Sequence, residues 1–536
     1  MRQQTLSTVL LDAASRFTSR TALITPAKRL TYGELIERAL RLSAYLVETG
    51  LRPGGRVAIC LPKGEELSIA IYGALLAGAS YVPIDHATPA ARARLILRDA
   101  EPGHLITTQH VADALFRDEA REGLWAARQE VVVTLLTAFV PQEVDRVSWC
   151  EALSRAPLSQ AVPVQEQAVA YVLYTSGSTG KPKGVIQAHR GAVAFVEWGA
   201  RHLGLGPEDV LSQHASPSFD LTIFDFFASA VVGAALTPVP EWLFGQVAKT
   251  CRFIIKSGIT VWYSVPSVLL RPDAGTPLRE LASSSLRHVI LAGEVIPKPG
   301  LQELARRLPV GCTLSNWFGP TETNVFTFHD IGPEDLASEG PVPIGLPCPY
   351  AEIRLEDGSG APTEEGELLV CAPTVMEGYR GLDALTAQRF ERGADGRTFF
   401  RTGDMARFEK GRLIFLGRRD RLVKVRGYRV QLEELEHVLQ AHPAVTEASV
   451  VVLQESGVEL LGAALVLRAP SEALLDDVRR HCAERFPPYM VPSKLLPVDA
   501  LPRNNRGKID AQQVMELLSR PVNPPETMPS LRSGSA

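Results

Sequence analysis

The sequence lacks several features that mark particular protein classes. Its seven cysteines are scattered among 536 residues and never form a CxxC pair. An odd, dispersed set of cysteines predicts reduced thiols in a cytoplasm and argues against a disulfide framework or a zinc site. The N-terminus has no long apolar core of the kind found in signal peptides. The longest apolar run, 226–236, falls short of the roughly 20 residues that span a bilayer and predicts a buried core helix.

The chain also lacks an excess of charge of either sign. Lys and Arg number 56 against 60 Asp and Glu, so the formal net charge is −4. This balance gives no reason to expect nucleic acid or an anionic membrane as a partner. Hydrophobic residues make up 45% of the chain, which is ordinary for a globular protein. A chain of this length is expected to form more than one domain.

Strand-like and helical patterns alternate along most of the chain. The run 56–61 predicts a buried strand and 67–76 predicts a helix, and such alternation favours an α/β fold with largely parallel sheets. The pattern changes near 417–421, after which a basic turn, two helices and a strand form a compact α+β unit. We therefore expect a large N-terminal part, 1–419, and a small C-terminal part, 420–520. The stretch 521–536 is rich in Pro and Ser and is expected to be disordered.

The strongest chemical signal is a glycine-rich segment, Tyr174–Gly184, that follows the strand-like run 168–174. Three glycines allow close approach of the backbone to an anion, and hydroxyl and lysine side chains add donors and positive charge. It is not a Walker A loop, because Thr175 and Pro182 replace the Gly and the Ser or Thr that such a loop needs. On composition alone, a flexible polar surface loop fits as well.

This segment resembles the phosphate-binding loop of the adenylate-forming superfamily, which includes acyl-CoA synthetases, luciferases and the adenylation domains of nonribosomal peptide synthetases. Further segments similar to that family's motifs follow in its order along nearly the whole chain. They are Leu30–Leu35, Leu75–Asp85, Asn316–Glu322, Gly366–Arg380, Arg401–Asp404, Gly417–Glu436, Pro487–Pro492 and Asn505–Asp510. The second ends in VPID, which is characteristic of the peptide-synthetase branch. The resemblance implies the adenylate-forming fold, with a small, mobile C-terminal domain.

The resemblance also implies ATP and Mg²⁺ as cofactors. Glu322 follows a Gly-Pro turn, and its carboxylate is the hard ligand that Mg²⁺ prefers, although a solvated turn glutamate would look the same. Phe318 replaces the usual tyrosine, so its ring keeps the ability to stack on adenine. The residues carried over to ATP and phosphate are Thr175, Ser176, Gly177, Ser178, Thr179, Lys183, Phe318, Thr321, Asp404 and Arg418.

Two residues of the C-terminal part receive roles from the resemblance. Lys508 matches the family lysine that bridges the substrate carboxylate and the α-phosphate, where a cation offsets the repulsion between two anions. Taken singly, it would be read as a solvated lysine. Asp420 matches the hinge about which the C-terminal domain rotates between two half-reactions, and the loop 424–429 would then face the incoming thiol.

A second resemblance indicates which residues bind the substrate. The segment Phe219–Thr222 is similar to the peptide-synthetase substrate helix, whose aspartate holds an α-ammonium group, although Asp220 could simply cap a helix. The pocket residues carried over are Asp220, Leu221, Phe224, Ser264, Ile290, Ala292, Trp317, Val325 and Phe326. Three large rings, Phe224, Trp317 and Phe326, would fill the space of a long side chain. We therefore expect a small amino acid, alanine first, then glycine or serine, with proline as runner-up.

Two other functions remain open at this point. A small-acid CoA ligase of the same superfamily would share the ATP motifs, but Asp220 and the VPID segment favour an amino acid. A catalytically inactive paralogue that serves as a scaffold is disfavoured, because Lys508, Glu322 and Asp404 are all present. Only a short stretch follows Lys508, so we expect a free-standing adenylation enzyme. It would load the phosphopantetheine thiol of a separate carrier protein.

Overall fold

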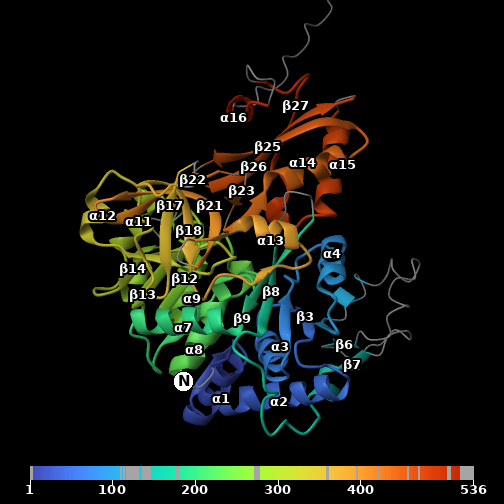
Figure 1. The fold of residues 1–536 in the computed structure, drawn as a ribbon, viewed down its shortest axis with the longest axis vertical. Coiled ribbons are helices and arrows are strands. Elements are labelled where there is room, and N and C mark those ends of the chain that lie inside the picture. Colours follow the sequence, from blue (N-terminus) through green and yellow to red (C-terminus); the bar gives the residue numbers. More distant parts are fainter. Residues whose placement is uncertain are drawn as a thin grey trace, which may run out of the picture.

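A computed structural model describes residues 4–108, 111–112, 115, 132–135, 146–176, 181–270, 278–357, 361–393, 396–419, 422–425, 427–455, 458–468, 471–503 and 509–519. The expected tail 521–536 lies outside these ranges. Within them, no helix is both long enough and apolar enough to cross a bilayer. The described residues from 422 onward lie at one end of the long axis and the first two helices at the other (Figure 1).

One large sheet carries the glycine-rich segment. Its strands run in the order β19-β9-β8-β4-β3-β5-β6-β7, and the pairs from β4 through β7 are parallel. These strands are β3 (Arg56–Cys60), β4 (Ser80–Pro83), β5 (His104–Thr107), β6 (Val132–Leu135), β7 (Arg146–Ser148), β8 (Val169–Thr175), β9 (Lys183–Ala188) and β19 (Gly378–Tyr379). The nearly continuous apolar runs of β3 and β8 fit strands that are buried on both faces.

A second large sheet is built mainly from the middle of the chain. Its strands run in the order β16-β15-β14-β13-β12-β10-β11-β1-β2, with parallel pairs from β14 to β1. They are β1 (Thr21–Ile24), β2 (Arg29–Thr31), β10 (Val210–Gln213), β11 (Ala235–Pro238), β12 (Val261–Ser264), β13 (His288–Ala292), β14 (Thr313–Phe318), β15 (Thr327–Asp330) and β16 (Leu346–Pro347).

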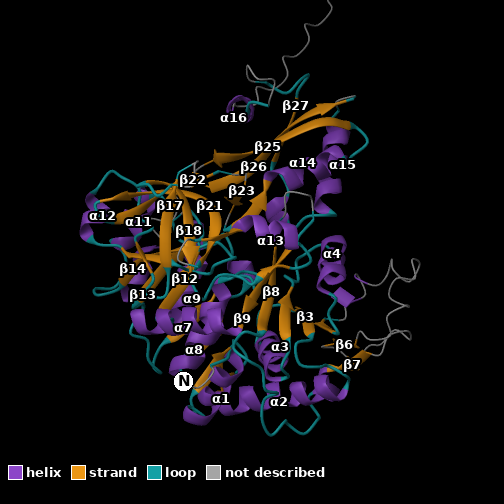
Figure 2. Ribbon diagram, viewed as in Figure 1, coloured by secondary structure: helices purple, strands orange, loops and turns teal. Residues whose placement is uncertain are grey.

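Helices join the two sheets into one apolar core (Figure 2). Those in this core are α1 (Leu6–Arg16), α2 (Tyr32–Glu48), α3 (Glu65–Leu76), α6 (Trp149–Ala152), α7 (His189–His202), α8 (Leu221–Val232), α9 (Val247–Ser257) and α11 (Lys298–Ala305). The short helix α12 (Pro333–Ala337) packs Leu336 against this core, whereas α4 (Ala90–Ala100) and α13 (Asp383–Arg389) pack in other apolar clusters. The apolar run 226–236 is only partly helical, because Gly233 adopts a left-handed conformation that ends α8 before β11.

An antiparallel sheet leads from the large part to the small one. Its strands are β17 (Glu352–Glu356), β18 (Glu365–Cys371), β20 (Phe390–Arg392), β21 (Thr398–Glu409) and β22 (Arg412–Arg418). It packs around its own apolar cluster, which includes Leu368, Phe400 and Leu413. β22 ends at Arg418, and the predicted hinge residue, Asp420, lies outside the described residues.

The C-terminal part has its own sheets and core. It contains the hairpin β23 (Leu422–Val425) and β24 (Tyr428–Gln431), and the sheet β25 (Val445–Glu455), β26 (Val458–Leu467) and β27 (Lys494–Pro497). Its helices are α14 (Leu432–Gln440), α15 (Glu472–Ala483) and α16 (Ala511–Ser519). The predicted fold is confirmed: a large α/β part with mixed sheets and a smaller C-terminal α+β part.

Candidate active site

The glycine-rich segment begins where β8 ends. Thr175 is the last residue of that strand, Ser176 follows it, and Lys183 opens the antiparallel return strand β9. Both Thr175 and Ser176 are buried and line a pocket of about 1050 Å³, a volume that includes its open mouth. Three predicted phosphate ligands, Gly177, Ser178 and Thr179, lie outside the described residues, so their roles stay predictions.

The Gly-Pro-Thr-Glu segment folds into a tight loop after β14. A side-chain carbon placed on Gly319 would lie 1.7 Å from the carbonyl oxygen of Asn324, so only glycine allows this closure. The loop directs Thr321 to the pocket, while Glu322 is fully buried beside it. The hydroxyl of Tyr379 donates to Oε1 of Glu322 at 2.6 Å.

Glu322 is an ionised carboxylate in a buried place. Burial by itself raises the pKa of its carboxyl, but the charges of Arg429 and Lys183 and the Tyr379 hydrogen bond outweigh burial and lower the pKa to about 2. The guanidinium of Arg429 forms an ion pair with Oε2. A single ionised carboxylate fits Mg²⁺, which commonly takes one or two carboxylates and completes its shell with phosphate oxygens and water. Among the described residues, no three His, Cys, Asp or Glu side chains cluster as a metal site.

Asp404 and Arg418 face one another across β21 and β22. Nη1 of Arg418 donates to Oδ1 of Asp404 at 2.5 Å, and Nη2 donates to the carbonyl of Thr402 at 3.0 Å. Burial raises the pKa of Asp404, and the positive charges of Arg418 and Lys424 oppose that rise. The two predicted nucleotide residues are thus brought together, although neither lines the described pocket. Phe318 contacts Phe415 nearby, at a ring-centre distance of 5.4 Å.

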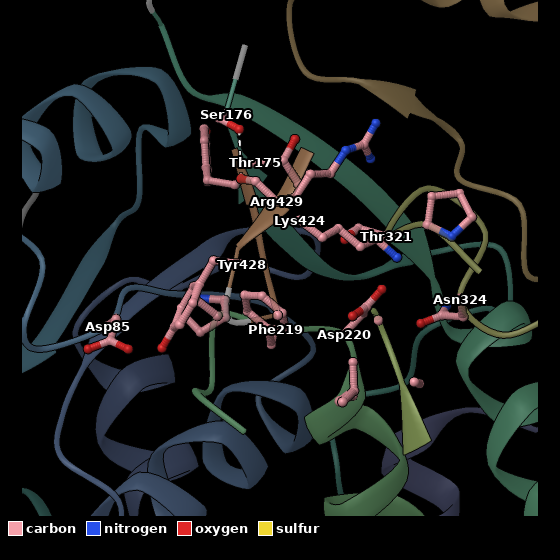
Figure 3. Close-up of a pocket in the computed structure, with 18 of the residues that line it drawn as sticks. Asp85, Thr175, Ser176, Phe219, Asp220, Thr321, Asn324, Lys424, Tyr428 and Arg429 are labelled. Atoms are coloured by element: carbon pink, nitrogen blue, oxygen red, sulfur yellow. Dashed lines mark hydrogen bonds between the residues drawn. The ribbon is translucent and has the colours of Figure 1, made fainter. Parts of the chain in front are cut away.

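The hairpin β23–β24 of the C-terminal part inserts into the pocket (Figure 3). Lys424 crosses the pocket toward Thr321, and the ring of Tyr428 packs edge-on against Phe219 at 4.9 Å. Turn residue Gly427 has a φ of +82°, and a side-chain carbon there would lie 2.3 Å from Val265. The hairpin therefore fits against Val265 because Gly427 carries no side chain.

Asp220 stands at the start of α8, between the phosphate side of the pocket and an apolar wall (Figure 3). The side chain of Thr321 is hydrogen-bonded to its carboxyl group. Burial raises the pKa of Asp220, while the nearby charge of Lys424 lowers it. The carboxylate makes no side-chain hydrogen bond that caps the helix, so capping does not explain its place in the pocket.

The apolar wall only partly matches the residues expected from the sequence. Leu221, Ala292 and Val325 line the pocket as expected, together with Phe195 and Tyr263, which the sequence did not single out. Phe224, Ser264, Ile290, Trp317 and Phe326 are buried and do not line it.

Two of the three expected rings form a second layer behind this wall. Trp317 packs against Phe224 at a ring-centre distance of 5.0 Å, and it also contacts Phe195 and Tyr263. The third ring, Phe326, belongs to the separate apolar cluster of the antiparallel sheet. The first two rings therefore support the pocket wall from behind.

Strand geometry explains the place of Ser264. Successive side chains of β12 point to opposite faces, so Tyr263 faces the pocket and Ser264 faces away. The Ser264 hydroxyl accepts a hydrogen bond from the indole of Trp262 and donates to the carbonyl of Val265. No glycine or proline fixes the register inside this strand, so the sequence pattern did not distinguish the two neighbours.

The segment that carries Lys508 lies outside the described residues. On either side of it, Arg503 and Ile509 pair in an isolated β-bridge. Ile509 packs with Leu501 and Val514 in the C-terminal core, and none of these three residues lines the pocket. The described arrangement thus has the β23–β24 hairpin in the pocket.

Family comparisons agree with this geometry. The model of the AMP-binding enzyme family matches residues 10–380, and that of the AMP-binding enzyme C-terminal domain matches residues 434–508. The chain belongs to this family, the adenylate-forming superfamily, on its peptide-synthetase branch. It is an AMP-forming ligase.

Curated relatives and solved structures place the chain among adenylation enzymes. An L-proline--[L-prolyl-carrier protein] ligase of Streptomyces coelicolor is 38% identical, covering 96% of this chain and 97% of the relative. A protein of the same name from Pseudomonas fluorescens is 35% identical, covering 94% and 97%. A fused adenylation–PCP di-domain from Klebsiella oxytoca aligns with a TM-score of 0.76 at 25% identity, covering 92% and 94%.

Proposed function

We propose that the chain uses ATP to convert a small L-α-amino acid into its aminoacyl adenylate, and then transfers the aminoacyl group to the phosphopantetheine thiol of a separate carrier protein. The observation that carries this proposal is the carboxylate of Asp220. It stands where the apolar wall meets the phosphate side of the pocket. A charge-assisted pair in such a place selects an α-ammonium group over a plain carboxylic acid.

In the first half-reaction, the substrate carboxylate attacks the α-phosphorus of ATP and pyrophosphate leaves. Two anions approach one another in this step, so a cation between them lowers the barrier. We assign the role of that cation to Lys508. We assign the hinge of the domain rotation that brings Lys508 into the site to Asp420. Thr175 and Ser176 would donate to phosphate oxygens, and Asp404 would accept from the ribose hydroxyls.

Glu322 is the residue that would hold Mg²⁺. The metal, when bound, supplies positive charge that neutralises the phosphate oxygens during the displacement. The fit rests on the carboxylate of Glu322, which is buried and ionised and lies within the electrostatic reach of Lys183 at the start of β9.

Among small amino acids, we place L-proline first and alanine second. Both full-length relatives described above are named for L-proline. The pocket wall supports the same order, because Phe195, Leu221, Tyr263 and Val325 offer apolar contact to ring carbons. Proline carries two more methylenes than the methyl group of alanine, and each buried CH₂ contributes about 0.8 kcal/mol. Alanine remains second because Trp317 packs directly behind Phe195 and Tyr263. This packing limits outward movement of the two wall side chains and so favours small substrates.

Amino-acid-dependent ATP–pyrophosphate exchange tests the proposal. We expect exchange with L-proline to exceed that with alanine by about tenfold, as two methylenes predict. Glycine, serine, leucine, phenylalanine, acetate and propionate complete the panel. Stronger exchange with propionate than with any amino acid would favour a small-acid CoA ligase. No exchange with any acid would favour an inactive paralogue.

A second measurement identifies the thiol acceptor. Radiolabelled substrate should pass to a phosphopantetheinylated carrier protein, and free CoA should be a poor acceptor. The same carrier without its phosphopantetheine arm is the matched control. Equal transfer to CoA and to the carrier would contradict the carrier-protein assignment.

A further inference from the structure

Strand β24 contacts two polar side chains, Ser176 and Glu322, that the proposed ATP and metal site would need. The hydroxyl of Ser176 donates to the carbonyl of Arg429 at 2.8 Å and accepts from the backbone N–H of Gln431 at 3.0 Å. The guanidinium of Arg429 forms an ion pair with Glu322. One strand of the C-terminal part therefore contacts both the phosphate-loop serine and the candidate metal carboxylate.

The ion pair leaves little room for a second cation. The side chains of Arg429 and Glu322 are only 10% and 1% exposed, so water screens the pair weakly. Tyr379 already holds the other oxygen of the carboxylate. A divalent cation on Oε2 of Glu322 would meet the positive guanidinium at contact distance, and the two like charges would repel strongly.

We propose that Arg429 and the divalent cation are alternative partners of Glu322, so that insertion of the hairpin and binding of the metal exclude one another. This inference rests on the proposed function, because the cation is expected only for an enzyme that uses ATP. Arg429 is then a positioning residue. It takes the place of the metal on Glu322 once the first half-reaction is complete.

Linkage makes the effect reciprocal. If hairpin insertion weakens metal binding, metal binding must weaken hairpin insertion by the same factor. Mg²⁺ with ATP would therefore hold the hairpin out of the pocket during adenylation. Departure of the metal with pyrophosphate would let Arg429 return to Glu322. Competition between the metal and Arg429 for the carboxylate of Glu322 would thus set the order of the two half-reactions.

Manganese binding tests the proposal without any turnover. Electron paramagnetic resonance of free Mn²⁺ measures its affinity for the full chain in the presence of an ATP analogue with an α,β-methylene bridge. Arg429→Gln should bind Mn²⁺ about tenfold more tightly than the wild type, a typical size for coupling between sites. Arg429→Lys keeps the charge and should stay close to the wild type. Glu322→Gln should lose the site.

Lys424→Gln is the matched control, because it removes one positive charge from the same hairpin without touching Glu322. It should raise the Mn²⁺ affinity less than twofold. An unchanged or lower affinity in Arg429→Gln overturns the proposal, and so does an equal rise in Lys424→Gln. Melting temperatures establish that each variant is folded.

The experiments distinguish failure of the proposed function from failure of the proposed exchange between Arg429 and the metal. The titration contains no amino acid, so a wild type without amino-acid-dependent exchange would refute amino acid activation and leave the metal result readable. A wild type that exchanges with L-proline, combined with unaltered Mn²⁺ affinity in Arg429→Gln, would refute the exchange of partners alone.

Discussion

Arg92 of α4 and Glu434 of α14 form an ion pair between the large part and the C-terminal part. Nη1 of Arg92 lies 2.6 Å from Oε1 of Glu434, and the side chains are 8% and 0% exposed. Oε2 of Glu434 is buried without a hydrogen-bond partner among the described residues. Pairs of this kind are costly to bury, and in some proteins they specify one arrangement without adding stability. The pair joins the two parts in the described arrangement, in which the hairpin occupies the pocket, and we expect it to favour that arrangement.

Loss of one partner should therefore impair thioester formation. Glu434→Gln removes the charge that Arg92 faces, and leaving a buried charge unpaired typically costs about 3–5 kcal/mol. We expect carrier loading from preformed adenylate to fall at least tenfold, while pyrophosphate exchange changes less than twofold. Single-turnover loading and exchange assays measure the two.

The double variant Arg92→Met, Glu434→Gln should recover part of the loading rate, because no unpaired charge remains. Arg20→Gln is the control, since its pair with Glu208 is exposed and should contribute little. Equal losses of exchange and loading in Glu434→Gln would show a merely structural role.

Gly427 offers a steric test of hairpin insertion. Gly427→Ala should slow thioester formation more than adenylation, because its added methyl would collide with Val265 in the described arrangement, where the hairpin is in the pocket. Gly411→Ala is the matched control: Gly411 also has a positive φ, +76°, but nothing lies within 4 Å of an added carbon. Loading rates with a carrier protein measure the effect. If both variants lose loading equally, backbone strain and not the collision is responsible.

Sequence reasoning found the parts of the site that lie in glycine-marked loops. The segments around Thr175 and Glu322 were located because their glycines, prolines and charged residues have fixed spacing. Tyr263 was missed because its strand offers apolar residues at both faces and no marker of register. The motif at Lys424–Arg429 was found, but its contact with Glu322 depends on how two distant parts pack, which no local pattern encodes.

Tyr263 should control substrate size more than its neighbour. Tyr263→Ala removes a ring from the pocket wall, and leucine or methionine should gain at least fivefold relative to proline in pyrophosphate exchange. Ser264→Ala, one residue later and facing away, should leave the preference unchanged. A buried aromatic truncation costs about 3–5 kcal/mol, so the melting temperature must be checked first. A larger change in Ser264→Ala would reverse the assignment of the two positions.

Asp220 predicts both a mutational effect and a pH dependence. Asp220→Ala should abolish exchange with amino acids, because the α-ammonium would lose its charged partner. In the wild type, the raised pKa of Asp220 means that its carboxylate is protonated at a higher pH than an exposed aspartate. As pH falls, kcat/KM for proline should therefore decline earlier than the ordinary aspartate value of about 3.9 predicts. An acid limb at or below that value would show that Asp220 does not control amine binding.

Substitution of Lys508 should impair adenylation more than carrier loading, which is the reverse of the effect expected at Glu434 and Gly427. Lys508→Ala removes the cation expected between the carboxylate and the α-phosphate, so exchange should fall about a hundredfold or more. Loading of a carrier from chemically prepared aminoacyl adenylate should persist near the wild-type rate. Lys494→Ala, in the same small part, is the control for nonspecific loss. Near wild-type exchange in Lys508→Ala would remove this lysine from the first half-reaction.

The two ends of the pocket are supplied largely by different elements. The amino-acid wall comes from α7, α8, β12 and β13 and from Val325, whereas the phosphate end depends on the end of β8 and on the loop after β14. A substitution in the wall can change which side chain is accepted without moving the groups that contact the nucleotide. Selection can therefore explore new substrates on this scaffold while the ATP chemistry is inherited intact, and descendants that differ in substrate would keep a common pyrophosphate-exchange reaction.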